Sequence, residues 1–384
     1  MYLHIVDDAS QLNQFIERTN EMFPEQHLFY VLTKKGKTEI IVKKKNVIPI
    51  IPSNRNIASI AKELPSYKAI FIHNLCYYKS KIILKSDASN RFIWFVWGFD
   101  YYNTYPRFFS KLFLKYTKFI NIILFKYSLS VKALVFRVHP ATKYFGLISK
   151  DRIKQNAAKR FVSTVNNMPN HSALFNVVNI PVENRFNGIY YSIESITKGS
   201  GEQNIVLGDN IFIGNSASNT SNHIDLFLKL KSIGVNNREL IVPLSYGCSR
   251  YRLVIKWLGT IIFKEKFKPL LNILPLEIYN RQVNSCNVMI FNHKRAQAIG
   301  NIIMGIWSGH KVFLRKSNPV YSYLKSLGIE VFSIENELLL TNLNELEKER
   351  KRINREIIIK QYGELQIREN YLQLIERIEN EIKK

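Results

Sequence analysis

Short apolar runs recur along the first half of the chain, and polar segments of helix-forming composition separate them. The apolar runs are residues 2–6, 28–33, 38–43, 69–74, 92–98 and 161–166. They lack the strict apolar–polar alternation of a sheet with one face in water, so they predict strands of a parallel sheet covered by helices on both faces. We expect helices at about 9–22 and 54–64, and a helix or a strand at 77–85.

A second series of apolar runs follows a polar, glycine- and serine-bearing stretch at 182–204. Its predicted strands are residues 211–216, 239–247, 260–265, 287–292, 310–315 and 330–334. Strands that alternate with helices at this spacing are typical of a doubly wound α/β sheet. The sequence therefore predicts two Rossmann-like domains, at 1–198 and 199–340, followed by charged helices at 341–384.

Ligands of such sheets bind at the carboxyl ends of the strands. Gly214, Asn215 and Ser216 stand at such an end, and a run of small polar residues leads from them to a helix predicted at about 221–233. The glycine permits a tight turn, and the N–H groups and side chains after it can hold an anion. The stretch is neither a Walker loop nor a GxGxxG fingerprint, which argues against NAD. A plain turn with helix caps is the alternative interpretation.

Arg295 and Gln297 follow the strand predicted at 287–292 and open the next helix. A phosphate or sugar oxygen binds well at such a position. No Asp or Glu occurs from Ile278 to Ile329, a run of 52 residues. The resulting positive potential suits a diphosphate, although an exposed basic turn would have the same pattern.

Two residues of the first half are candidates for a catalytic base. Asp100 lies within the aromatic run FIWFVWGFDYY at 92–102, in which Trp94 and Trp97 are three positions apart, and His73 follows the apolar residues AIFI of the run at 69–74. A carboxylate or an imidazole at a strand end can accept a proton, and aromatic rings suit the apolar face of a sugar. The alternatives are core aromatics with a turn aspartate, and a core or capping histidine.

The net charge is +25, and residues 106–160 contribute +12 of it from 13 basic residues and one acid. If 106–126 is a helix, its basic residues share one face and its aromatic and aliphatic residues the other, which is typical of helices at a membrane surface. We therefore expect 106–160 to face a membrane. An amphipathic helix packed on its own core is the alternative. The basic residues of the shared face are Arg107, Lys111, Lys115 and Lys118.

The remaining composition predicts a protein of a reducing compartment. Cys76, Cys248 and Cys286 have no metal-ligand spacing, so we expect neither a disulfide framework nor a zinc site. The N-terminus does not resemble a signal peptide, and 119–125, a strongly apolar stretch, is far shorter than the ~20 residues that span a bilayer. A non-catalytic protein that binds nucleic acid or another polyanion is an alternative function, as is an inactive transferase-like protein.

Together these motifs resemble the TDP-N-acetylfucosamine:lipid II N-acetylfucosaminyltransferase family, whose members are 4-alpha-L-fucosyltransferase-like glycosyltransferases. The resemblance covers roughly 70–334. It rests on the run W-x-x-W-G-x-D-x-Y at 94–102, on Gly214-Asn215-Ser216 with the later His223-Ile224, on Pro243 with Tyr246, and on Arg295, Gln297 and Ile299-Gly300.

The resemblance implies a metal-independent GT-B-type glycosyltransferase at the cytoplasmic face of the inner membrane. It would transfer a deoxy- or amino-deoxyhexose from a dTDP-type nucleotide-sugar to a lipid-linked saccharide. An inverting mechanism would need a base such as Asp100 or His73, whereas a retaining mechanism would need none. No cofactor beyond the donor is expected, and the sequence contains no Asp-x-Asp. The implied donor-binding residues of the second domain are Gly214, Asn215, Ser216, His223, Tyr246, Arg295, Gln297 and Gly300.

Overall fold

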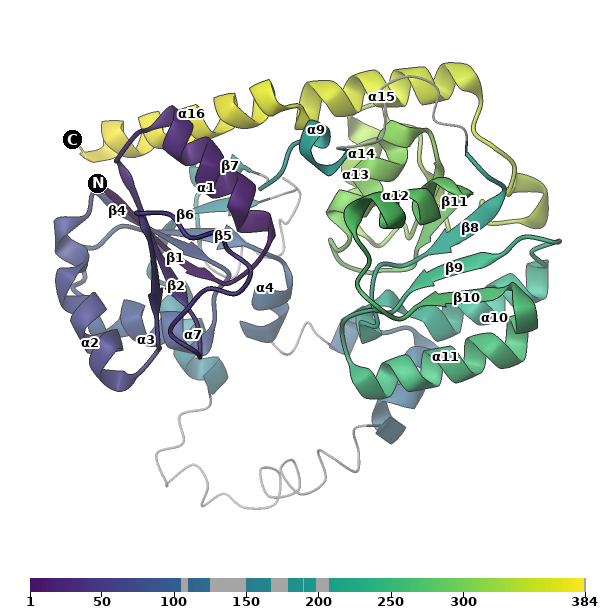
Figure 1. Cartoon of the computed structure of the whole chain (residues 1–384), viewed down its shortest axis with the longest axis horizontal. Helices are drawn as coiled ribbons and strands as arrows, with labels where there is room; N and C mark the ends of the chain where they lie inside the picture. The colour runs from purple at the N-terminus through teal and green to yellow at the C-terminus, as the bar shows by residue number, and fades with distance from the viewer. Residues whose placement is uncertain (105–109, 125–149, 167–178, 189, 198–206, 383–384) are drawn as a thin grey trace. The chain divides into compact units, whose positions relative to one another are not determined.

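A computed structural model describes residues 1–104, 110–124, 150–166, 179–188, 190–197 and 207–382 (Figure 1). The chain forms two compact units, each built around one sheet. Unit 1 comprises Met1–Phe109, Leu147–Ser192 and Glu364–Lys384, and unit 2 comprises Ser110–Gly146 and Ile193–Gly363.

Unit 1 contains a seven-stranded sheet in the order β3-β2-β1-β4-β5-β6-β7, with every neighbouring pair parallel. Its strands are β1 Tyr2–Asp7, β2 His27–Leu32, β3 Val47–Ile50, β4 Ala69–His73, β5 Phe92–Val96, β6 Phe161–Asn166 and β7 Arg185–Asn187. The strand predicted at 38–43 does not form. The reason is that the Asp8 carboxylate accepts the N–H groups of 39–41, which a sheet would otherwise pair.

Helices cover both faces of this sheet. On one face, α1 (Gln11–Met22) and α16 (Glu364–Ile382) bury a shared cluster that includes Phe15, Tyr371 and Leu374. On the other face lie α2 (Asn54–Glu63), α3 (Tyr77–Lys85) and α7 (Lys150–Ala158). Figure 1 shows α16, in yellow, beside α1. The segment at 77–85, for which the sequence left two possibilities, is therefore a helix.

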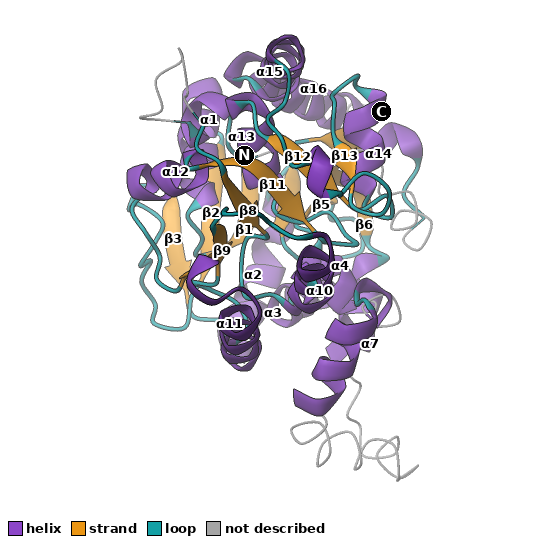
Figure 2. Cartoon of the chain, turned by 90° about the vertical axis from the view of Figure 1, so that its right-hand side faces the viewer, coloured by secondary structure: helices purple, strands orange, loops and turns teal. Residues whose placement is uncertain are grey.

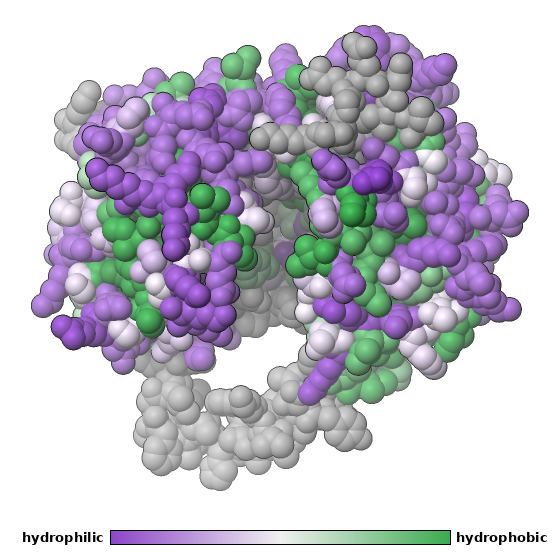
Figure 3. All heavy atoms as spheres, in the orientation of Figure 1, coloured by the Kyte–Doolittle hydropathy of each residue, from purple (hydrophilic) through white to green (hydrophobic). Residues whose placement is uncertain are grey.

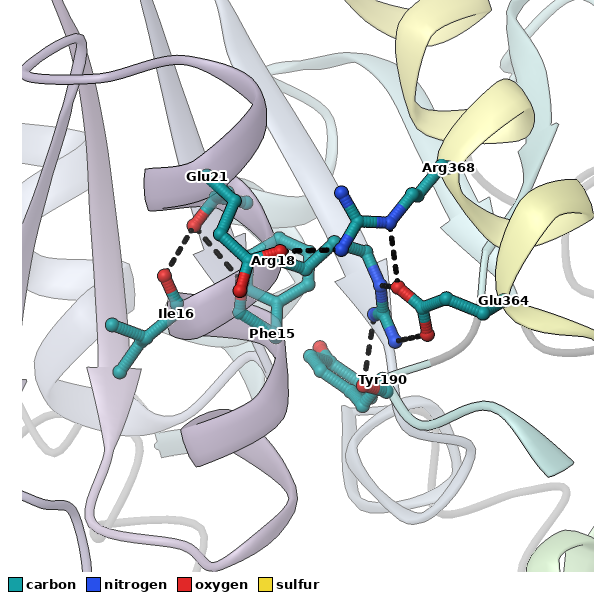
Figure 4. A network of polar contacts seen from close by, with 8 residues as sticks. Phe15, Ile16, Arg18, Glu21, Tyr190, Glu364 and Arg368 are labelled. Carbon is teal, nitrogen blue, oxygen red and sulfur yellow. Dashed lines mark hydrogen bonds and ion pairs between the residues drawn. The ribbon is translucent and has the colours of Figure 1, made fainter. Parts of the chain in front are cut away.

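The C-terminal helix is fixed to unit 1 by polar contacts as well as by packing (Figure 4). Arg18 of α1 is buried, and its guanidinium donates two hydrogen bonds to the Glu364 carboxylate, each 2.8 Å long. Its third contact is the carbonyl oxygen of Tyr190 at 3.1 Å, and Arg368 bridges Glu364 to Glu21. These contacts give the buried Arg18 guanidinium a counter-charge and hydrogen-bond acceptors.

Unit 2 contains a six-stranded parallel sheet in the order β10-β9-β8-β11-β12-β13. Its strands are β8 Asn210–Ile213, β9 Leu240–Pro243, β10 Phe267–Leu270, β11 Cys286–Phe291, β12 Lys311–Leu314 and β13 Phe332–Ser333. The prediction of a strand at 260–265 was wrong. The helix α11 (Ser249–Phe263) continues through most of that run, because Tyr251, Ile255, Gly259 and Phe263, four apart, form its buried face.

Helices also cover both faces of the second sheet, as Figure 2 shows in purple around the orange strands. On one face, α10 (His223–Ile233) and α11 pack on β8, β9 and β11. On the other face, Phe212 of β8 contacts Tyr279 of α12 (Leu276–Asn284), and Met289 of β11 lies against Gly305 of α13 (Ile299–Ser308). The remaining helices are α4 Phe99–Thr104 in unit 1 and α9 Ile193–Ile196, α14 Pro319–Ser326 and α15 Lys348–Tyr362 in unit 2.

The structure divides the chain differently from the predicted domains. The predicted boundary at 198/199 lies close to the observed one at 192/193, but residues 341–384 form no separate part. Instead, α15 packs on α13 in unit 2, whereas α16 completes the core of unit 1. Apolar residues on one stripe of each charged helix explain this, because each stripe needs a core to cover it.

The basic segment predicted as one helix at 106–126 is described only from 110 to 124. A short turn, η2 (Ser110–Leu112), precedes a helix that begins at 115, so Lys111 does not share a helical face with Lys115 as predicted. The N–H groups of Tyr116 and Thr117 bond to the Asp225 carboxylate, which caps the new helix. Arg107 lies outside the described residues.

Candidate functional site

The order of strands in unit 2 places its candidate site between β8 and β11. From these two central strands the chain winds outward in opposite directions, to β9 and β10 on one side and to β12 and β13 on the other. The loops after two such strands lie at the position, here called the crevice, where parallel α/β sheets bind ligands. Gly214 begins one of these loops and Asn292 the other.

The turn at Gly214 requires glycine for two reasons. Its φ of +69° lies in the left-handed region, and a Cβ here would stand 2.9 Å from Nε2 of His223. The loop then pairs with the loop after β9, since Ala217 N donates to Tyr246 O and Cys248 N donates to Ala217 O. These two backbone hydrogen bonds join the loops after β8 and β9 at the end of the sheet.

Gln297 links the two sides of the crevice. Its Nε2 donates to Asn215 Oδ1 at 3.0 Å and to Ser221 Oγ at 3.4 Å, and its Oε1 accepts the Thr220 hydroxyl at 2.6 Å. Asn215 Nδ2 in turn donates to Tyr246 Oη at 2.9 Å. The structure therefore brings together Asn215, Tyr246 and Gln297, which the sequence had singled out from three separate segments. Ser216 is buried beside them.

Basic side chains gather at the same end of the sheet. Arg295 Nε lies 3.4 Å from the Thr220 hydroxyl, and Arg315 donates to Asn292 Oδ1 at 2.8 Å and pairs with Glu335 at 3.0 Å. Burial, and after it the positive charge of Arg315, lowers the pKa of Lys294. One carboxylate among three basic groups leaves an excess of positive charge, which an anionic ligand would neutralise.

Two buried histidines, His223 and His293, lie next to residues of this site. Burial lowers the pKa of His223 to about 3, and burial together with the charge of Arg295 lowers the pKa of His293. Both rings are therefore neutral at pH 7. Within the part of the chain that the structure describes, neither ring nitrogen of His223 has a hydrogen-bond partner. Its place directly under Gly214 indicates that His223 shapes the turn.

The loop that contains Arg295 and Gln297 leads directly into the first turn of α13. Ala298 stands at its N-cap with a φ of +61°, no side chain caps the turn in the structure, and Gly300 is the second residue of the helix. Backbone N–H groups of an uncapped first turn attract anions, and the helix dipole adds to that attraction.

Asp100 of unit 1, predicted as a base, is completely buried. Its Oδ2 accepts the N–H of Leu75 at 3.0 Å and the indole N–H of Trp94 at 2.8 Å, and its Oδ1 accepts the N–H of Trp97 at 3.1 Å. Burial raises the pKa of Asp100, and these hydrogen bonds act against that rise. Both oxygens are occupied, so this carboxylate connects three segments of the unit and offers no open oxygen to a substrate.

His73, the other predicted base, is also completely buried. Its Nε2 and Nδ1 lie 2.8 Å from His4 Nδ1 and Tyr190 Oη, and His4 Nε2 lies 2.8 Å from His27 Nδ1. Trp97 Nε1 donates to Tyr190 Oη. If the Tyr190 hydroxyl in turn donates to His73 Nδ1, then His73 and His4 each donate from Nε2 to the next ring. Burial, and secondarily the charge of a neighbouring lysine, lowers the pKa of His73.

Sequence reasoning missed His293 and Arg315. His293 follows the strand predicted at 287–292, and Arg315 is the last residue of the strand predicted at 310–315, so a position at the carboxyl end of a strand is the signal that could have identified them. Within the described residues, no cluster of three or more His, Cys, Asp or Glu side chains is arranged to hold a metal ion.

The comparison with protein families matches unit 2. The model of the family described as 4-alpha-L-fucosyltransferase glycosyl transferase group 56 matches residues 194–375. This match confirms the resemblance seen in the sequence motifs, and it includes the crevice with Gly214 and Gln297. The aromatic motif at 94–102 lies outside it. No curated protein matches the chain.

Solved glycosyltransferases have the same overall fold. The Anabaena protein HepE in complex with UDP-glucose is 12% identical, with a TM-score of 0.61 over 99% of this chain and 100% of that chain. A sucrose-phosphate synthase from Thermosynechococcus elongatus is 8% identical, with a TM-score of 0.60 over 98% and 99%. A trehalose 6-phosphate synthase from Burkholderia multivorans is 8% identical, with a TM-score of 0.61 over 100% and 98%.

At these identities the likeness concerns the fold, which is the predicted pair of Rossmann-like domains of GT-B enzymes. The activity follows from the family match, which spans the unit that contains the crevice. The protein is a GT-B-type hexosyltransferase similar to the 4-alpha-L-fucosyltransferases of glycosyl transferase group 56.

Proposed function

We propose that the protein transfers a deoxy- or amino-deoxyhexose from a dTDP-type nucleotide-sugar to a lipid-linked saccharide in the synthesis of a cell-surface polysaccharide or antigen. Unit 2 binds the donor and unit 1 the acceptor. The observation that carries this proposal is the Gln297 network, which connects both sides of the crevice in the unit that the fucosyltransferase family model matches.

The chemistry of the crevice suits a nucleoside diphosphate. The N–H groups at the start of α13 and the basic groups Lys294, Arg295 and Arg315 can bind its two phosphates. The same groups stabilise the charge that develops on the diphosphate when the bond to the sugar breaks. Because this positive charge comes from the protein, we propose that the reaction needs neither a metal ion nor a cofactor beyond the donor.

Structural neighbours support a nucleotide-sugar as the donor. HepE was solved with UDP, with UDP and glucose, and with UDP-glucose. A fucose-like sugar is proposed because the matched family is described as 4-alpha-L-fucosyltransferase. The dTDP base is proposed from the resemblance of the sequence motifs.

Ligand-dependent stability tests the donor. Melting temperatures are measured with dTDP, UDP and GDP, each with and without EDTA. A nucleotide at 100 times its Kd stabilises the protein by about 2.7 kcal/mol. We expect dTDP to give the largest shift and EDTA to leave it unchanged. Arg295→Ala should lose most of the shift while its own melting temperature stays near that of the wild type. The absence of a shift with all three nucleotides would refute the donor site.

A lipid-linked acceptor requires the enzyme to work at a membrane, which we place at the cytoplasmic face of the inner membrane. The helix at 115–124 supports this. Thr117 and Asn121 face the core, whereas Tyr116, Phe119, Ile122 and Ile123 are exposed, with Phe119 61% exposed. Lys115 and Lys118 flank these residues and are exposed as well. An apolar surface next to basic residues favours an anionic bilayer.

A second apolar stripe lies on α11 of the same unit. Leu253, Trp257 and Ile261, four residues apart, are all more than half exposed, and Figure 3 shows hydrophobic side chains over this helix. Arg250 of α11 lies 3.5 Å from the carbonyl oxygen of Leu124, so the stripe begins next to the helix at 115–124. We propose that both stripes contact the bilayer. No helix among the described residues is long and apolar enough to cross a membrane.

A further inference from the structure

The sheet of unit 1 has its own ligand-binding position, between β1 and β4. From these adjacent central strands the chain winds outward to β2 and β3 on one side and to β5, β6 and β7 on the other. The carboxyl end of β1 is Asp7, and β4 ends at His73, followed by Asn74. Ligands of parallel sheets bind outside the ends of two such strands.

One oxygen of Asp7 is firmly held at this position. Its Oδ2 accepts a hydrogen bond from Asn74 Nδ2 at 2.8 Å and lies 2.9 Å from the ammonium of Lys79. Lys79 is completely buried, and it also donates to the carbonyl oxygens of His73 at 2.6 Å and Asn74 at 3.2 Å. A buried ammonium needs a counter-charge, so Lys79 fixes the Asp7 carboxylate in one orientation.

The other oxygen of Asp7 is open. The side chain is 34% exposed, and no donor from the described residues reaches Oδ1. Two neighbouring aspartates, Asp8 and Asp100, differ from it. Asp8 uses both oxygens to accept the N–H groups of 39–41, and Asp100 is completely buried with both oxygens occupied. Of these three carboxylates, Asp7 is the one that can touch a bound acceptor.

We propose that Asp7 is the general base of the sugar transfer, an inference that rests on the function proposed above. The acceptor O–H bond breaks and its proton passes to Asp7 Oδ1. The acceptor oxygen then forms a bond to C1 of the donor sugar. The bond between C1 and the phosphate oxygen breaks, and its electron pair leaves with the nucleoside diphosphate. Because the acceptor attacks from the side opposite the leaving group, the configuration at C1 is inverted.

The experiment compares Asp7→Asn with its neighbour Asp8→Asn. Transfer is measured from dTDP-N-acetylfucosamine to a disaccharide on a short-chain prenyl diphosphate, and dTDP binding is measured separately. Loss of a general base lowers kcat by about 10²- to 10⁴-fold. We expect such a loss in Asp7→Asn with dTDP affinity unchanged. Asp8→Asn should lower the melting temperature but retain kcat within about threefold of the wild type.

Asp7→Asn leaves Lys79 buried without a counter-charge, so it can fail to fold. The double variant Asp7→Asn/Lys79→Met removes both charges and should be folded, bind dTDP and be inactive. An NMR assignment of the product anomer provides an independent readout, for which we expect inversion.

The possible results separate the two proposals. If the wild type transfers sugar with retention, or if a folded Asp7 variant keeps its kcat, Asp7 is not the base and the proposed function stands. If dTDP does not bind and the wild type transfers no sugar, the proposed function and the base fail together.

Discussion

Arg18 and Glu364 lie 346 positions apart in the chain, yet they form an ion pair with two hydrogen bonds of 2.8 Å, from Nε to Oε1 and from Nη2 to Oε2. Burial acts to raise the pKa of Glu364, but the hydrogen bonds and charge of Arg18 outweigh it and lower that pKa to about 2. This pair lies where α16 begins, so it helps to return the C-terminal helix to the core of unit 1.

We expect Glu364→Ala to destabilise unit 1, because the variant leaves the buried Arg18 without its counter-charge. Removal of one partner of a fully buried pair costs about 3–5 kcal/mol, and about 2 kcal/mol is expected here because Glu364 is one-third exposed. Urea unfolding monitored by circular dichroism measures the loss. Arg352→Ala, which removes exposed pairs with Glu349 and Glu356, is the control and should leave the curve unchanged. Equal curves for both variants would contradict the role of the Arg18 pair.

The buried histidines of unit 1 predict a loss of stability in acid. Burial lowers the pKa of His27 to about 4, whereas an exposed histidine has a pKa of 6.5. The unfolded chain therefore binds more protons between these two pH values. The contribution of His27 is complete above pH 6.5 and is lost as the pH falls toward 4.

For His27 alone this contribution amounts to about 3 kcal/mol. Urea unfolding at pH 7.5, 6, 5 and 4.5 measures it in the wild type and in His27→Phe. The variant should lose less stability between pH 6.5 and 4.5, although it is less stable at pH 7.5 because His4 Nε2 loses its partner. Parallel pH profiles for the two proteins would be inconsistent with a neutral buried His27.

Gly214→Ala should weaken donor binding. The alanine would be forced to a φ of +69°, which costs about 1–2 kcal/mol, and its Cβ would stand 2.9 Å from His223 Nε2 and displace the loop. Gly234→Ala is the matched control, because it has a φ of +84° but its Cβ would make only ordinary van der Waals contact, 3.9 Å from the methyl groups of Leu340, at the far end of α10. Both variants should have lower melting temperatures, and only Gly214→Ala should lose affinity for dTDP in calorimetry. Loss of affinity in both would attribute the effect to general destabilisation.

Asp100→Asn tests whether Asp100 stabilises unit 1 and takes no part in catalysis. An amide cannot accept hydrogen bonds on both sides, so at least one of the N–H groups of Leu75, Trp94 and Trp97 would lose its partner. We expect a destabilisation of about 1–3 kcal/mol with kcat unchanged in the folded fraction. Asp87→Asn, at an exposed turn, should change neither quantity. Full stability together with lost turnover would instead restore Asp100 as the base.

The exposed stripe of 115–124 predicts binding to anionic membranes. The double variant Phe119→Ser/Ile122→Ser removes two exposed apolar side chains, each worth about 1.5–3 kcal/mol when fully buried in a bilayer. We expect the wild type to sediment with phosphatidylglycerol vesicles and the variant to bind them at least about tenfold more weakly. Leu365→Ser alters an apolar residue of unit 1 that is even more exposed, at 85%, and should bind like the wild type. Binding of all three proteins would place the membrane contact elsewhere.

Much of the fold could be predicted from local patterns in the sequence. The apolar runs identified most strands of both sheets because a strand covered on both faces must be apolar at successive positions. The predictions failed where a distant group competes for the backbone. Asp8 accepts the N–H groups of 39–41, and the Asp225 carboxylate decides that a helix begins at 115.

The candidate donor site was partly predictable as well. Gly214, Asn215 and Gln297 could be selected because each lies just after an apolar run, where parallel sheets bind ligands. Their hydrogen bonds could not be predicted, since Asn215 and Gln297 are 82 positions apart and meet only because β8 and β11 are neighbours in the sheet.

The roles of the acidic residues were decided by tertiary structure. Asp7, Asp8 and Asp100 all follow apolar runs, and the sequence distinguishes them only by their neighbours. In the folded protein Asp100 is buried and accepts the indole N–H of Trp94, and Asp8 accepts the backbone N–H groups of 39–41. Asp7 pairs with the buried Lys79 through one oxygen, and its other oxygen is open. Burial and strand order bring together residues that are distant in the chain, so a local pattern can identify a strand end but not which carboxylate remains accessible there.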